Sequence, residues 1–219
     1  MSDPSDSENQ ILDLWPTRFL RRRIGDCESW NKDLIKLVRE LERTNKNLTT
    51  DYLAPDLFNM DHAAVNWLRE NVNATVIEYL RALGIDYAVN WTITGWASVN
   101  RFGDYHDAHN HPWSYLSGTY YVKMPASLET LQSRSDVRPG CITFYDPRGG
   151  VNMNAIKNDP YVDPEYTVLP EPGLMLLWPA FVNHFVHPNL SKETRISISF
   201  NIVLKWSDEY LPDQGPTQG

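Results

Sequence analysis

Residues 103–112 read Gly103-Asp104-Tyr105-His106-Asp107-Ala108-His109-Asn110-His111-Pro112, and this stretch decides how the rest of the chain is interpreted. Successive side chains of a β-strand point to opposite faces, so an extended stretch brings His109 and His111 side by side. Two imidazoles at this spacing are able to reach one metal ion, and imidazole is a ligand for iron, zinc, copper and nickel. His106 has the opposite parity in a regular strand and is expected to point away from that ion.

A second group of histidines is expected to supply the third ligand. Residues 178–188 read WPAFVNHFVHP, in which His184 and His187 are three positions apart. Residues at this separation point to opposite faces of a strand, so only one of the two can join His109 and His111.

The spacing around both groups resembles the two motifs of cupin-type double-stranded β-helices. Five residues separate Gly103 from the first pair, and five separate Gly173 from Pro179, with His184 five positions further on. The resemblance implies the cupin-like fold and selects His184 as the distal ligand. The glutamate of the first cupin motif has no counterpart here, so ordinary cupin function is not implied.

The rest of the chain is helical in its first part and rich in strands in its second. Apolar residues recur at helical spacing after Ser29, the expected N-cap, and from about Asp61 to Leu83, before a helix-terminating Gly84. Short β-branched and aromatic runs punctuated by Pro and Gly follow, which predicts a jelly roll. We expect an α+β, mainly β fold, a double-stranded β-helix with N-terminal packing helices. The predicted strands are 87–102, 115–124, 141–145, 173–178, 181–187 and 194–206.

One domain with two short tails is the expected organisation. Residues 1–10 are polar and acidic and are expected to be disordered, residues 11–206 to form the domain, and residues 207–219 a C-terminal tail. Within the domain the helical part spans about 29–84 and the jelly-roll core about 87–206. The N-terminal helices could mediate a homodimer, although the sequence leaves the oligomeric state open.

Composition excludes several classes of partner. The net charge of −8 argues against a nucleic-acid partner, which requires a basic surface. The chain has no apolar run of about 18 residues, and its first ten residues lack the features of a signal peptide, so we expect a cytoplasmic protein without a membrane span. In such a reducing compartment Cys27 and Cys141 are expected to be free thiols.

The last predicted strand carries an arginine on a polar face. Arg195, Ser197 and Ser199 share one face of residues 194–200, and the alternate residues are apolar. A guanidinium makes a bidentate pair with a carboxylate, and a neighbouring hydroxyl adds a donor. Arg195 follows His184 by eleven residues. This arrangement resembles the iron(II)/2-oxoglutarate oxygenases, in which an Arg-x-Ser pair about ten residues after the distal His binds the 5-carboxylate of 2-oxoglutarate.

Further motifs are similar to those of a family of small 2-oxoglutarate/iron(II) oxygenases from bacteria and phages. They are LSGTYYV at 116–122, DPR at 146–148 and RISISFN at 195–201, and the resemblance covers residues 11–206. It implies Fe(II) on His109, His111 and His184, with 2-oxoglutarate and O2 as cosubstrates. The cosubstrate contacts that it implies are Arg195, Ser197 and Asn100, together with Tyr121 or, as the other candidate, Tyr120. One tyrosine of a similar Tyr-Tyr strand in prolyl hydroxylases binds the cosubstrate carboxylate.

His111 departs from this superfamily, which places a carboxylate at that position. Asp107 and Asp146 are the alternative carboxylate ligands, and we prefer three histidines. The expected reaction is hydroxylation of an unactivated C–H of a small molecule or peptide, with release of succinate and CO2. Expected substrate contacts are Trp113, Arg148, Trp178 and the loop at 147–164.

Two other functions fit the same residues. A three-His dioxygenase would need no 2-oxoglutarate, and Arg195 would then bind a substrate carboxylate directly. A cupin-like binding protein would have no catalytic activity.

Overall fold

The computed structural model describes residues 15–45, 47–49, 56–131, 133–148, 164–205 and 207. The expected tail at 1–10 lies outside the described residues, as do most of the tail at 207–219 and most of the loop at 147–164.

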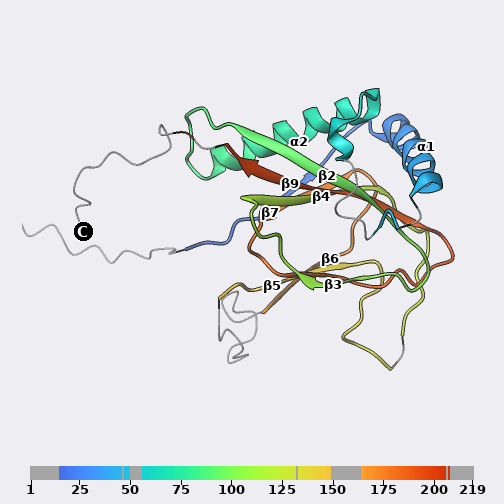
Figure 1. Cartoon of the computed structure of the whole chain (residues 1–219). Helices are drawn as coiled ribbons and strands as arrows, with labels where there is room; N and C mark the ends of the chain where they lie inside the picture. Colours follow the sequence, from blue (N-terminus) through green and yellow to red (C-terminus); the bar gives the residue numbers. More distant parts are fainter. Residues whose placement is uncertain are drawn as a thin grey trace, which may run out of the picture.

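Two antiparallel sheets face each other in the described part of the chain (Figure 1). The larger sheet has the strand order β1-β7-β4-β9-β2, and the smaller sheet has the order β3-β8-β5-β6. Consecutive neighbours in the sheets come from distant parts of the sequence, as expected for the double-stranded β-helix. The strands are β1 (Leu20–Arg23), β2 (Trp91–Asn100), β3 (His106–His109), β4 (Leu116–Lys123), β5 (Ile142–Tyr145), β6 (Glu165–Val168), β7 (Leu174–Pro179), β8 (His184–Val186) and β9 (Arg195–Leu204).

Two helices, α1 (Glu28–Thr44) and α2 (Ala63–Ala82), lie against the larger sheet on the side away from the smaller one (Figure 1). A short 3-10 helix, η1 (Leu57–Asn59), precedes α2. The expected N-cap at Ser29 is wrong, because α1 begins at Glu28 and its N-cap is Cys27, two residues earlier. Gly84 follows α2 at φ +81°, the left-handed conformation expected of a glycine at this position.

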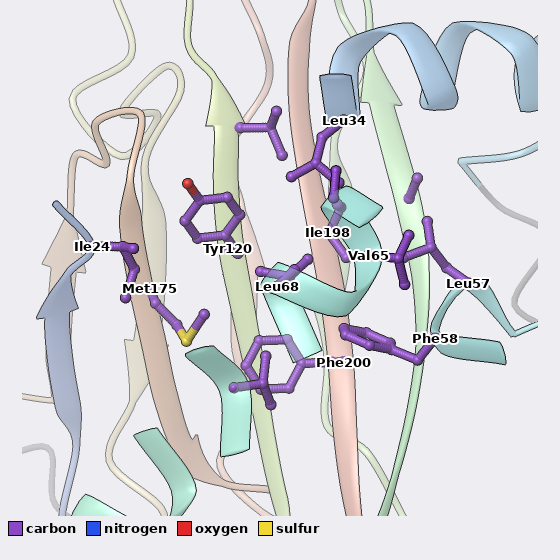
Figure 2. Close-up of a cluster of buried hydrophobic side chains, with 14 of the residues drawn as sticks. Ile24, Leu34, Leu57, Phe58, Val65, Leu68, Tyr120, Met175, Ile198 and Phe200 are labelled. Atoms are coloured by element: carbon purple, nitrogen blue, oxygen red, sulfur yellow. The ribbon is translucent and has the colours of Figure 1, made fainter. Parts of the chain in front are cut away.

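The main core lies between the helices and the larger sheet. On β9 the alternation predicted from the sequence is confirmed, since Ile196, Ile198 and Phe200 are all buried against the helical layer. Figure 2 shows Ile198 and Phe200 beside Leu68 of α2. A fully buried side chain of this size contributes about 1.5–3 kcal/mol, so this layer holds the outer face of the sheet firmly.

The opposite face of the larger sheet points toward the smaller sheet and is partly polar. A second apolar cluster, which includes Phe144, Leu176 and Trp178, fills one part of the space between the sheets. The remaining space is lined by the polar face of β9 and by histidines of the smaller sheet. The jelly roll therefore leaves a polar cavity between its two sheets.

Strand β6 was not predicted, since residues 165–168 form a short and largely exposed segment at the edge of the smaller sheet. Both cysteines are free thiols, as expected. No helix in the described part of the chain is long and apolar enough to cross a membrane.

Candidate metal and cosubstrate site

Three histidines from separate places in the fold converge at one end of the cavity. His109 ends β3, His184 begins β8, and the two are paired directly across the smaller sheet. His111 follows β3, where its backbone N–H donates to Ala180 O at 3.0 Å. One ring nitrogen from each histidine lies within 4.8 Å of the others, so the three imidazoles could hold one ion. In the described part of the chain, no other group of three or more His, Cys, Asp or Glu side chains is close enough together to hold an ion.

Backbone carbonyls orient two of these rings. His109 Nδ1 lies 2.6 Å from Asp107 O, and His184 Nδ1 lies 3.3 Å from Val182 O. A carbonyl oxygen only accepts hydrogen bonds, so Nδ1 of each ring carries the proton and Nε2 keeps its lone pair. This is the tautomer that leaves Nε2 available to a metal ion.

Burial favours the neutral form of His111 and His184. Desolvation, followed by the neighbouring His109, lowers the pKa of His111 to about 4. Desolvation also lowers the pKa of His184 well below its ordinary value of 6.5, with His109 and His111 adding to the effect. At neutral pH these rings therefore present lone pairs, as metal binding requires.

His106 lies in the same cavity, which corrects the expectation that it points away. In the pairing of β3 with β8, His109 lies opposite His184 and His106 lies opposite Val186. The two residues between His106 and His109 thus lie opposite the single residue Phe185, so β3 contains a β-bulge. Because of the extra residue in the bulge, the side chain of His106 points to the same face as that of His109 and lines the cavity.

The other candidate ligands lie elsewhere. His187 faces away from the three histidines, and its ring bonds Thr143 Oγ1 at 2.8 Å and the backbone N–H of Arg138 at 3.1 Å. Asp107 is exposed and accepts from the backbone N–H of Ala108. Asp146 is paired with Arg148. Neither carboxylate belongs to the group that could hold an ion.

Arg195 forms the other end of the cavity and is only 2% exposed. Its Nη2 donates to Asn100 Oδ1 at 3.0 Å, while Arg195 Nε and Asn100 Nδ2 have no partner among the described residues. No carboxylate of the described residues lies within 4.0 Å of its guanidinium. Ser197 lines the cavity next to it. A buried cation without a counter-ion is costly, so these donors fit an anionic ligand.

The two tyrosines of β4 point to opposite sides of the sheet. Tyr121 lines the cavity, and burial raises the pKa of its hydroxyl while Arg195 acts in the opposite direction. The phenol therefore stays protonated and able to donate. Tyr120 is buried under the helices, where its hydroxyl donates to Asn31 Oδ1 at 2.7 Å (Figure 2). Tyr120 is thus wrong as a cosubstrate contact, because adjacent strand residues face opposite ways.

The three side chains expected at the rim have different positions. Trp178 is not at the rim, since it is 2% exposed and packs edge-on against His184 with ring centroids 5.0 Å apart. Trp113 is 93% exposed in a left-handed conformation with φ 70°. Neither Trp113 nor Arg148 lines the pockets found beside the histidines in the described part of the chain.

Trp96 is a site residue that the sequence interpretation missed. It lies on β2, stacked on His111 with ring centroids 5.8 Å apart. Its parity on β2 matches that of Asn100, so strand alternation could have placed it on the cavity face. Trp96 also borders an open groove outside the cavity, which it shares with His106, His109 and His111.

The groove is a second space next to the three histidines. Its walls include Thr94 and Trp96 of β2, Asn110 of the histidine stretch, and Asn201 of β9. It opens to solvent, whereas the buried cavity leads to Arg195. The candidate metal position therefore has a closed polar chamber on one side and an open groove on the other.

Solved structures with the same fold include a prolyl-4-hydroxylase from Pseudomonas putida. That likeness has a TM-score of 0.58 at 10% identity and covers 86% of this chain and 88% of the other. A prolyl hydroxylase from Trichoplax adhaerens, solved with a hypoxia-inducible-factor peptide, gives 0.55 at 13% identity, with 84% and 83% covered. HygX from Streptomyces hygroscopicus, solved with nickel and 2-oxoglutarate, gives 0.50 at 15% identity, with 85% and 82% covered.

At the level of sequence, no curated protein matches the chain. Residues 94–201 match the family model described as "Putative 2OG-Fe(II) oxygenase". The match runs from the start of the groove wall at Thr94, through the three histidines, to Asn201 at the end of the polar face of β9. The chain belongs to the 2OG-Fe(II) oxygenases, enzymes that use iron(II), 2-oxoglutarate and O2.

Proposed function

We propose that this oxygenase hydroxylates an unactivated C–H bond of a small molecule or peptide, with iron held by His109, His111 and His184. The observation that carries the proposal is the buried Arg195 guanidinium, which faces the same cavity as the three histidines. In a three-His dioxygenase Arg195 would instead bind a substrate carboxylate directly, and the match to a 2OG-Fe(II) oxygenase family supports 2-oxoglutarate as its ligand.

The residues present fit both the metal and the cosubstrate. Three imidazoles supply the ligand set, and the backbone carbonyls that bond Nδ1 of His109 and His184 leave Nε2 of these two rings for the ion. Three protein ligands leave further coordination positions for cosubstrate and O2, as in a facial triad. The far carboxylate of 2-oxoglutarate would be held by Arg195 with Ser197 and Tyr121, which line the same end of the cavity.

When bound, iron and 2-oxoglutarate together would supply the oxidising power: O2 would oxidise 2-oxoglutarate to succinate and CO2, with one oxygen atom entering succinate and the other the substrate. The chain itself orients and isolates this chemistry. Trp178 packs against His184 and excludes water from that side of the ligand. Trp96 stacks on His111 and separates the buried chamber from the open groove.

The substrate is proposed to approach through the groove rather than past Trp113 or Arg148. Thr94, Asn110 and Asn201 offer uncharged hydrogen-bonding groups along its walls, and Trp96 offers an aromatic face. These features support a small molecule or an exposed segment of a peptide as substrate. Separately, we propose that the enzyme acts in the cytoplasm.

The test is uncoupled turnover, the slow oxidation of 2-oxoglutarate that does not require substrate. Protein loaded anaerobically with Fe(II) is given 2-oxoglutarate and O2, and succinate is measured. We expect succinate from the native chain and none from His109→Ala or His184→Ala. His187→Ala is the matched control, since it removes a buried histidine outside the site. Oxygen consumption that is independent of 2-oxoglutarate, without succinate, would instead favour the three-His dioxygenase.

A further inference from the structure

His106 is the one cavity histidine whose position the metal site does not explain. It lies outside the group of ring nitrogens that could hold an ion, yet the bulge in β3 turns it into the same cavity. Its Nε2 is buried and has no hydrogen-bond partner among the described residues. A buried polar atom of this kind costs free energy unless a ligand satisfies it.

The strand register places His106 on the Arg195 side of the metal ligands. His109, His184 and Phe144 form one row across the smaller sheet, and His106 lies in the next row with Val186 and Ile142. Val186 and Ile142 line the cavity together with Arg195 and Tyr121. His106 therefore lies along the path that leads from the three histidines to the arginine.

The surroundings of His106 agree with this position. Desolvation lowers its pKa to about 4, and among its charged neighbours Arg195 contributes more than His109 or His111. In the tautomer with a proton on Nε2, this buried ring donates a hydrogen bond from that atom. Arg195 Nε and Asn100 Nδ2 also have no partner among the described residues, and Arg195 lines the same cavity as His106.

We propose that His106 donates a hydrogen bond from Nε2 to the distal carboxylate of 2-oxoglutarate, beside Arg195, and acts as a specificity residue for that cosubstrate. The inference rests on the proposed function. An imidazole N–H donor would add directional recognition of the carboxylate beside the Arg195 guanidinium. The bulge in β3 is the structural feature that makes this contact available.

The experiment measures binding rather than turnover. 2-Oxoglutarate is titrated calorimetrically into the Ni(II)-loaded native chain, His106→Leu and His106→Gln. Leu keeps the bulk but removes the donor, while the side-chain amide of Gln keeps a donor near the position of Nε2. We expect His106→Leu to raise the Kd at least tenfold and His106→Gln to stay within about threefold of the native chain, since one hydrogen bond to a charged group contributes about 1.5–3 kcal/mol.

Two controls make the outcome specific. 2-Oxovalerate, which has a methyl group in place of the distal carboxylate, should bind the native chain and His106→Leu equally weakly. His187→Ala should leave the Kd for 2-oxoglutarate unchanged, since His187 lies outside the cavity. Nickel content is measured for every variant.

Three results would overturn the inference. The first is a Kd for His106→Leu within twofold of native, and the second is an equal loss of affinity in His106→Leu and His106→Gln. The third is loss of nickel from both variants, which would make His106 a metal ligand. If the native chain itself binds no 2-oxoglutarate, the proposed function fails instead, so the two failures are distinguishable.

Discussion

Replacing Arg195 with Met separates ligand binding from folding stability. The substitution removes the guanidinium of a residue that is 2% exposed, and that guanidinium donates to the neutral side chain of Asn100. Met has a similar length and no charge, so the costly burial of an uncompensated cation disappears. Asn100 Oδ1 loses its donor, which costs about 1–3 kcal/mol. Because these effects oppose each other, we expect the melting temperature of the ligand-free protein to change by only a few degrees.

The effect on cosubstrate binding should be large. Removing one partner of a buried, hydrogen-bonded charge pair costs about 2–5 kcal/mol. Each 1.4 kcal/mol corresponds to a factor of ten in Kd, so Arg195→Met should weaken 2-oxoglutarate binding roughly 30-fold to several thousand-fold. Arg195→Lys keeps the charge but lacks the planar fork, and it should fall between the native chain and the Met variant.

Thermal unfolding with Ni(II) and 2-oxoglutarate reads out both effects at once. At 100 times the native Kd, the ligand should stabilise the native chain by about 2.7 kcal/mol. For a chain of this size, that is a rise in melting temperature of roughly 5–11 °C. A variant weakened 30-fold should gain less than about 1 kcal/mol, or roughly 2–4 °C, under the same conditions.

Arg134→Met is the matched control, because Arg134 is exposed, is paired with Asp136 and is absent from the cavity walls. It should keep the full ligand-induced rise. If Arg195→Met also keeps the full rise while its ligand-free melting temperature drops sharply, Arg195 is a structural residue and the assignment of the anion site is wrong.

Three further predictions concern the two tyrosines, the packing of the larger sheet and the pH dependence. Tyr121→Phe should raise the KM for 2-oxoglutarate several-fold in a succinate assay, whereas Tyr120→Phe should leave KM unchanged and lower the free energy of unfolding by about 1 kcal/mol. Gly118→Ala should destabilise the protein by about 1–3 kcal/mol in urea unfolding, because a Cβ there would lie 2.3 Å from the Phe200 ring; an unchanged midpoint would contradict the packing. Native His111 has a pKa of about 4, against 6.5 when unfolded, so the unfolded state binds more protons between these values. Stability of the metal-free protein should therefore be complete above pH 6.5 and decline toward pH 4. A urea midpoint that stays constant as the pH is lowered from 7 to 5 would contradict this prediction.

The alternation of residues within single strands accounts for what could be predicted about the site. Arg195 and Ser197 face the cavity while Ile198 faces the helices, and each position follows from the two-residue period of β9. The same rule should have separated Tyr120 from Tyr121, and it could have identified Trp96 from its parity with Asn100. These are local properties of a strand, so they are visible in the sequence.

The helical layer was also predictable in outline, since amphipathic spacing marks α1 and α2 within a residue or two. Helix ends were less certain, as the error at Ser29 shows. A cap depends on which backbone groups the local fold leaves unpaired, and the periodic pattern does not contain that information.

The sequence by itself determined the jelly roll and the face of each long strand. It also identified three histidines and one arginine as residues whose side chains could meet within the fold. Only the tertiary structure decided the place of His106, because a β-bulge is a mismatch between two strands, and β8 lies about 75 residues beyond β3. The burial of Trp178 against His184 and the groove beside Trp96 likewise depend on how the two sheets pack. Such contacts join residues distant in the chain, and their geometry is set only when the whole fold closes around the cavity.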